Sequence, residues 1–142
     1  MPVNHFDPEA WLAVAEACCI GIPAADEQAL LRTALNRAYY AALLCVKHRI
    51  ETAQGAGAVP RIGSHTAILD AVRSGGSTFT GMYGALRKLK RKREAADYEL
   101  GTPPLVRPLV HRTVQQTRTL ISTRIKSLPE AEFRRLRVPR AY

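Results

Sequence analysis

An arginine and an aspartate share the packed face of a strongly basic segment. Arg93 and Asp97 stand four residues apart where the spacing predicts a helix, so their side chains can pair across one turn. The apolar line of that helix, Met82, Leu86 and Leu89, continues at the same spacing to Arg93. Two explanations fit a guanidinium on a packed face: it forms an ion pair that fixes how helices pack, or it holds a phosphate in a groove.

The neighbouring basic residues are predicted to point away from this line. Six of the seven residues from Arg87 to Arg93 are Lys or Arg, and helical spacing places Lys88, Arg91 and Lys92 on the outward side. Their charge suits the sequence-independent binding of a nucleic-acid backbone. A solvated helix surface explains the same run equally well, and the sequence leaves both explanations open.

Two other segments are expected to bring side chains to Arg93. Arg37 and Tyr40, three residues apart near the border of an apolar helix, are predicted to face it. His65 begins a short helix after a glycine-rich loop, and an imidazole with a pKa near neutrality is suited to moving protons. The expected cleft is lined by Arg37, Tyr40, Arg93, Asp97 and Tyr98.

Helices must position these residues, because no segment alternates apolar and polar residues long enough to form a half-buried strand. Turn residues and apolar periodicity predict five helices, at about 7–20, 26–50, 64–72, 80–100 and 105–128. The predicted class is all-α, an up-and-down bundle of four to five helices in one domain, residues 1–128. Residues 129–142 are predicted to form a basic C-terminal tail.

The positive charge is confined to the second half of the chain. Residues 1–70 hold five Lys and Arg against seven Asp and Glu, a balance of −2, whereas residues 71–142 hold sixteen against five, a balance of +11. Such a field attracts phosphates, so RNA is the expected partner. A high net charge also serves solubility alone, which is the alternative explanation.

Composition predicts a soluble, cytoplasmic protein without a bound metal. No stretch approaches the roughly 20 apolar residues of a membrane span, and the first residues do not have the layout of a secretion signal. The three cysteines, Cys18, Cys19 and Cys45, lack the paired spacing of a zinc site and are predicted to be buried thiols. No metal site, no cofactor and no membrane contact are therefore expected.

Two motifs, in this order, resemble those of HEPN domains. The first is Arg-Ala-Tyr-Tyr-Ala at residues 37–41, which a glycine-rich loop and a short helix headed by His65 follow. The second is Arg-x-x-Ala-Asp-Tyr at residues 93–98. The chain is similar to the bacterial and archaeal branch of HEPN domains over roughly residues 7–127.

The resemblance implies a helical bundle that dimerises, found in toxin–antitoxin and antiviral defence systems. Many relatives are metal-independent ribonucleases in which an Arg, and a His shortly after it, meet the same motif of a second subunit. By that resemblance Arg93 holds the scissile phosphate. Tyr98 stands where the His is expected, and a phenol with a pKa of about 10 is a poor base at neutral pH. His65 is the candidate replacement.

Two functions follow from these expectations. The first is an RNA-directed effector of a toxin–antitoxin or antiviral defence system, acting as a homodimer through Arg93, Tyr98 and His65 and either cleaving RNA or only binding it. The second is a catalytically silent HEPN module that dimerises and docks a nucleotidyltransferase-like or other defence protein. A DNA-binding regulator is disfavoured, because the second predicted helix is too apolar to read a groove.

Overall fold

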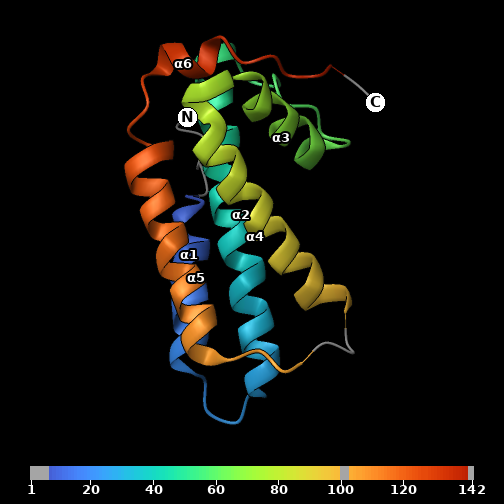
Figure 1. Cartoon of the computed structure of the whole chain (residues 1–142), viewed down its shortest axis with the longest axis vertical. Helices are drawn as coiled ribbons and strands as arrows, with labels where there is room; N and C mark the ends of the chain where they lie inside the picture. Colours follow the sequence, from blue (N-terminus) through green and yellow to red (C-terminus); the bar gives the residue numbers. More distant parts are fainter. Residues whose placement is uncertain (1–6, 100–102, 141–142) are drawn as a thin grey trace, which may run out of the picture.

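The computed structural model describes residues 7–99 and 103–140, and within them the regular structure is entirely helical (Figure 1). The all-α class expected from the sequence is therefore confirmed for these residues. The elements are α1 (Glu9–Ile20), α2 (Glu27–Gln54), α3 (Ser64–Ser74), η1 (Gly76–Phe79), α4 (Thr80–Tyr98), α5 (Arg107–Leu120), η2 (Ile121–Ile125) and α6 (Glu130–Arg134).

Helix α2 forms the centre of the molecule. It begins where the Asp26 carboxylate accepts a hydrogen bond from the backbone N–H of Ala29, and it continues for 28 residues without Gly or Pro. Its buried face is broad and contacts several neighbouring helices. The buried residues are Leu31, Ala34, Leu35, Ala38, Tyr39, Ala41, Ala42, Leu43, Cys45, Val46 and Ile50. The helix ends four residues later than expected, at Gln54, because Gly55 at φ 114° supplies a conformation that other residues rarely adopt.

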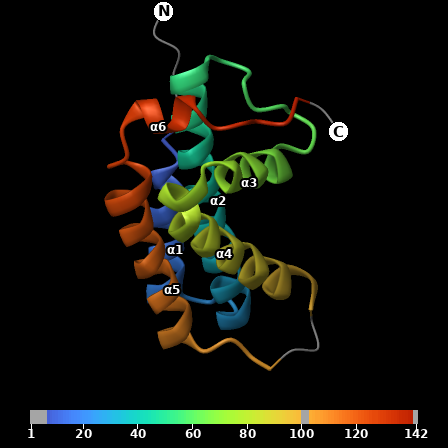
Figure 2. The same ribbon diagram turned by 45° about the horizontal axis from the view of Figure 1, so that its top comes forward.

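Helices α1, α2, α4 and α5 run along the length of the molecule, and each runs opposite to the one before it (Figure 1). Helix α1 packs along α2, and α5 packs against both of them. Helix α4 crosses α2 obliquely and diverges from α5 toward its own C-terminal end (Figure 2). The short helix α3 lies against the first half of α4, beside the C-terminal half of α2.

The C-terminal segment differs most from expectation. The helix expected at 105–128 is shorter, because α5 ends at Leu120 and a turn of π-helix follows. Residues 129–140 do not form a detached tail: Phe133 is fully buried and Leu136 is 5% exposed. The amide of Gln54 donates to the backbone carbonyls of both residues, at 2.9 Å each. This segment therefore closes one end of the helical core.

The structure bears on two further expectations, about membrane spans and about the cysteines. No helix among the described residues is long and apolar enough to cross a membrane. The three cysteines are free and buried, as their composition and spacing predict. Burial raises the pKa of the Cys45 thiol to about 11, so this sulfur is an unreactive core atom at neutral pH.

Candidate functional site

Arg93 is a largely buried cation on the inner face of α4. Its side chain is 12% exposed, and its Nη1 lies 3.5 Å from Oδ2 of Asp97, one turn further along the helix. Its Nη2 lies 4.0 Å from Oε1 of Glu94. The Nε atom is buried and has no hydrogen-bond partner among the described residues. The spacing of Arg93 and Asp97 predicts their pairing, whereas the orphaned Nε is a feature of the folded structure alone.

Two tyrosines of α2 form an aromatic surface beneath Arg93. The guanidinium carbon lies 5.0 Å from the centre of the Tyr39 ring and 5.9 Å from that of Tyr40. The two rings meet edge to face, with centres 5.5 Å apart. A cation within about 6 Å of an aromatic ring centre is attracted by the ring's negative face. The two aromatic rings therefore replace part of the hydration shell of this cation.

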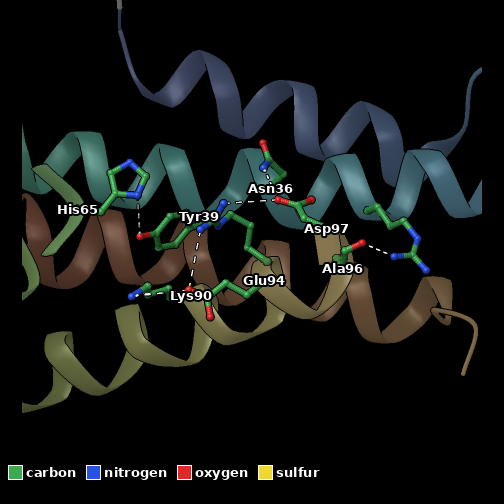
Figure 3. A network of polar contacts seen from close by, with 9 residues as sticks. Asn36, Tyr39, His65, Lys90, Glu94, Ala96 and Asp97 are labelled. Carbon is green, nitrogen blue, oxygen red and sulfur yellow. Dashed lines mark hydrogen bonds and ion pairs between the residues drawn. The ribbon is translucent and has the colours of Figure 1, made fainter. Parts of the chain in front are cut away.

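His65, in the first turn of α3, completes a cluster with Arg93, Tyr39 and Tyr40. The Tyr39 hydroxyl oxygen lies 3.5 Å from Nδ1 of His65, a long contact that Figure 3 shows beside the helix. The imidazole packs edge-on against both tyrosines, at 5.7 Å from the Tyr39 ring centre and 5.3 Å from that of Tyr40. His65 and Arg93 thus contact the same pair of rings, although 28 positions separate them in the sequence.

The surroundings of His65 and Tyr39 favour the neutral form of both side chains. Burial lowers the pKa of His65, and the positive charges of Arg93 and Lys90 lower it further. Burial raises the pKa of Tyr39 to about 12, against the opposing effect of Arg93. At neutral pH the imidazole is therefore an unprotonated base beside a permanent cation.

Polar side chains at the rim fix the geometry (Figure 3). Asn36 of α2 donates its side-chain amide to Asp97 Oδ2 at 3.2 Å. The Nζ atom of Lys90 lies 3.6 Å from Oε1 of Glu94, one turn along α4. Each carboxylate that pairs with Arg93 is therefore also held by a second side chain, so the position of the guanidinium is fixed from two sides.

Two residues of the expected cleft lie elsewhere. The Arg37 guanidinium stacks 4.2 Å above the Trp11 ring of α1, because its position on α2 faces α1 and not α4. Tyr98 is the last residue of α4 and is 73% exposed, so its ring extends into solvent beyond the packed part of the helix. Of the five residues expected to line one cleft, Tyr40, Arg93 and Asp97 come together.

The basic run of α4 is divided between two surfaces. Arg87, Lys90 and Arg91 line a depression of about 230 Å³ between α3 and α4. Lys88 and Lys92 line a different cavity, between α4 and α5. The three cations expected on one outward face, Lys88, Arg91 and Lys92, therefore belong to two sites.

Sequence reasoning did not assign Tyr39, Asn36, Lys90 and Glu94 to this site. Tyr39 is nevertheless one of the two rings that Arg93 and His65 both contact. The signal was present for two residues of α4, since Lys90 and Glu94 stand four residues apart and can pair across one turn beside Arg93. No local spacing reveals that α3 brings an imidazole to the same rings.

The cluster carries no set of side chains suited to a metal ion. Over residues 7–99 and 103–140, no group of three or more His, Cys, Asp and Glu side chains lies close enough to hold one. Its chemistry is that of a buried guanidinium, a neutral imidazole and two phenols. No family model, curated protein or solved structure matches this chain.

Proposed function

We propose that this chain is an RNA-directed effector with a HEPN-like fold, acting as a homodimer in a toxin–antitoxin or antiviral defence system. One observation carries the proposal: His65 and Arg93, from different helices, pack on the same two tyrosine rings. The imidazole needed for ribonuclease chemistry is missing from the second motif. In this proposal α3 supplies it from another direction.

The proposed reaction is cleavage of an RNA phosphodiester by the neighbouring ribose 2′-hydroxyl, without a metal ion. His65 is neutral at neutral pH because of burial and nearby positive charge, so it takes the proton of the 2′-hydroxyl. The 2′-oxygen bonds to phosphorus, the bond from phosphorus to the 5′-oxygen breaks, and water returns a proton to that leaving oxygen. Arg93 stabilises the charge that develops on the phosphate. The products are a 2′,3′-cyclic phosphate and a 5′-hydroxyl.

The depression between α3 and α4 is the proposed path of the RNA backbone. Arg87, Lys90 and Arg91 line it from α4, together with Glu94, and Thr66, the residue after His65 in α3, lines it from the other side with Asp70. Contacts of this kind are independent of sequence and weaken as counter-ions compete for the phosphates. The proposal therefore includes binding that declines steeply with salt concentration.

The test is RNA cleavage in the presence of EDTA by the full chain and three variants. His65→Gln removes the base and is expected to lower the rate by about 10²–10⁴-fold. Arg93→Met removes the charge while keeping a side chain of similar length, and it is expected to lower the rate similarly. His111→Asn is the matched control, because this exposed imidazole lies on α5 away from the cluster. Cleavage that persists in both cluster variants, or products without a cyclic phosphate, would refute the proposed chemistry.

A second function has an observation in its favour. Asp97 and Glu94 already balance the charge of Arg93, which is the arrangement expected of an ion pair that fixes packing. On this alternative the chain is a catalytically silent HEPN module that docks a nucleotidyltransferase-like or other defence protein. Co-purification with the product of the adjacent gene, without RNA cleavage, supports it.

One substitution separates the two functions. If Arg93 holds a phosphate, Asp97 competes with that phosphate, so Asp97→Asn is expected to tighten RNA binding. If the pair is only structural, Asp97→Asn leaves RNA binding unchanged and lowers stability instead. Titration of labelled RNA at two salt concentrations, together with thermal unfolding of the same samples, measures both effects.

A further inference from the structure

A second cavity lies between α4 and α5. The ribbons of these two helices diverge in this region (Figure 2). Its volume is about 600 Å³, within the roughly 300–1,000 Å³ that is common for sites of small ligands. Leu35 of α2 and Val110 of α5 contribute to its lining, together with the segment that precedes α5. This cavity, called here the α4–α5 groove, shares no lining residue with the depression between α3 and α4.

The α4–α5 groove has a polar end and an apolar end. Lys88, Lys92, Thr113 and Gln116 line both this groove and an adjoining cavity of about 360 Å³, so they mark the boundary between the two. The ammonium group of Lys92 donates to Oγ1 of Thr113 at 2.8 Å and bridges α4 and α5 there. The residues that line only the larger cavity are mainly apolar, with Arg32 and Arg112 as the charged exceptions, and include Ala96, Pro104, Leu105, Val106, Leu109 and Val110.

The charge of the groove is uniformly positive. Arg32, Lys88, Lys92 and Arg112 contribute to its lining, and among residues 7–99 and 103–140 no Asp or Glu does so. The guanidinium of Arg32 donates a hydrogen bond to the backbone carbonyl of Ala96. Lys88 and Arg112 form no ion pair among the described residues. A positive cleft with apolar, low-dielectric walls focuses its field on an anion.

Apolar side chains are left exposed at the same place. Val106 and Leu109 line the groove and are 52% and 55% exposed. Each would lose contact with water if an apolar group occupied the apolar end. The groove therefore offers an anion-binding end and an apolar end to one ligand.

We propose that the α4–α5 groove binds a small amphipathic anion, an alkyl or acyl chain that ends in a phosphate or carboxylate. The headgroup lies between Lys88 and Lys92, and the chain extends along Val110 and Leu109 toward Leu105. This site is separate from the proposed RNA site and does not depend on it. A free single-chain anion is the expected form of the ligand, because the cavity is a small-ligand volume between two helices and not a flat surface.

The test uses alkyl phosphates of increasing chain length as probes, at concentrations at which they remain monomeric. Calorimetric titration of the full chain with butyl, hexyl and octyl phosphate is expected to show tighter binding along the series. Each methylene that enters the apolar end should lower Kd by about fourfold, the equivalent of about 0.8 kcal/mol. Inorganic phosphate and octanol, which lack one half of the ligand, are the matched probes and are expected to bind far more weakly.

Substitutions in the α4–α5 groove test where octyl phosphate binds. Lys88→Gln with Lys92→Gln removes the headgroup site and is expected to raise Kd for octyl phosphate by at least about tenfold. Leu109→Asn, at an exposed position, is expected to flatten the chain-length dependence while leaving the headgroup affinity in place. Arg91→Gln is the control, because it removes one cation of the same helix outside the groove.

Several outcomes would overturn the proposal. Equal affinities for inorganic phosphate and octyl phosphate would show that the chain is not accommodated. An equal effect of the Arg91 and Lys88/Lys92 substitutions would show general electrostatic attraction. Binding to anionic phospholipid vesicles without binding to monomeric octyl phosphate would assign the cations to a membrane surface instead. Loss of RNA affinity in the Lys88/Lys92 variant, with octyl phosphate binding unchanged, would make the groove part of the RNA site.

Discussion

His65 and Arg93 share the rings of Tyr39 and Tyr40, so a permanent positive charge lies close to an imidazole without an ion pair between them. Both burial and this charge lower the pKa of His65, and burial is the larger cause. The arrangement gives the imidazole two properties at once. It remains an acceptor at neutral pH, and it stands beside a group that stabilises negative charge.

The pKa of His65 is expected to lie below its ordinary value of 6.5 and to rise when Arg93 is replaced by Met. The rise should be partial, because the burial of the imidazole remains. Titration of the imidazole carbon-bound protons by NMR measures both values, with exposed His111 as the internal reference. An unchanged His65 pKa in the Arg93→Met variant would show that the guanidinium does not act on the imidazole.

The same shift predicts how stability depends on pH. In the unfolded chain His65 titrates near 6.5, whereas in the folded chain its pKa is lower, so between these values the unfolded state binds more protons. The contribution of His65 to stability is therefore full above about pH 6.5 and is lost as the pH falls through the folded-state pKa. Compared with His65→Gln, the wild-type chain should lose free energy of unfolding between about pH 7 and about pH 5. Urea unfolding of both proteins across this range checks the sign.

The length of the Arg93 side chain is expected to matter more to stability than its charge. Its stem packs among the tyrosine rings at 12% exposure, so Arg93→Ala leaves a void and should cost about 2–4 kcal/mol. Arg93→Met fills most of that space and leaves the Asp97 and Glu94 side chains, 27% and 44% exposed, in contact with water, so its cost should stay below about 1.5 kcal/mol. Denaturant unfolding decides between these values. Equal losses in the two variants would mean that the ion pair, and not the packing, supports the fold.

The elements of the site were largely predictable from the sequence. Uninterrupted helical periodicity from Asp26 onward and glycines at the helix ends identify α2, because these signals are local. The pairing of Arg93 with Asp97 is also local, since it lies within one turn. Such features depend on the geometry of one helix and not on how helices meet.

What the sequence does not show is the angle at which helices meet. Arg37 and Tyr40 lie three residues apart on α2, yet one stacks on α1 and the other packs under α4. A small rotation of α2 would exchange their neighbours, and no spacing rule gives that rotation. The position of His65 depends in the same way on where the loop after Gly55 places α3. Tertiary packing therefore decides which candidates form the site.

Two glycines provide a paired test of the packing around η1 and α4. A Cβ at Gly75 would overlap the ring of Phe79 and the side chain of Leu136, both of them buried and unable to move away. Gly75→Ala is therefore expected to cost about 1–3 kcal/mol. Gly84 lies inside α4 with no neighbouring atom within 4 Å of such a Cβ. Gly84→Ala should instead stabilise the helix by about 0.5–1 kcal/mol. Thermal unfolding of both variants tests the predicted difference in sign.

Phe133 connects the C-terminal segment to the core, and its removal tests whether residues 129–140 belong to the folding unit. The ring is fully buried, meets Phe79 edge to face at 5.4 Å and lies 4.7 Å below the guanidinium carbon of Arg49. Phe133→Ala is expected to cost about 3–5 kcal/mol. Arg134→Ala, next to it and with a side chain 62% exposed, should change stability by less than about 0.5 kcal/mol. If residues 129–140 were a detached tail, neither substitution would change the free energy of unfolding. If they are packed, Phe133→Ala alone lowers it by a large amount, and the loss persists at high salt because apolar contacts are not screened.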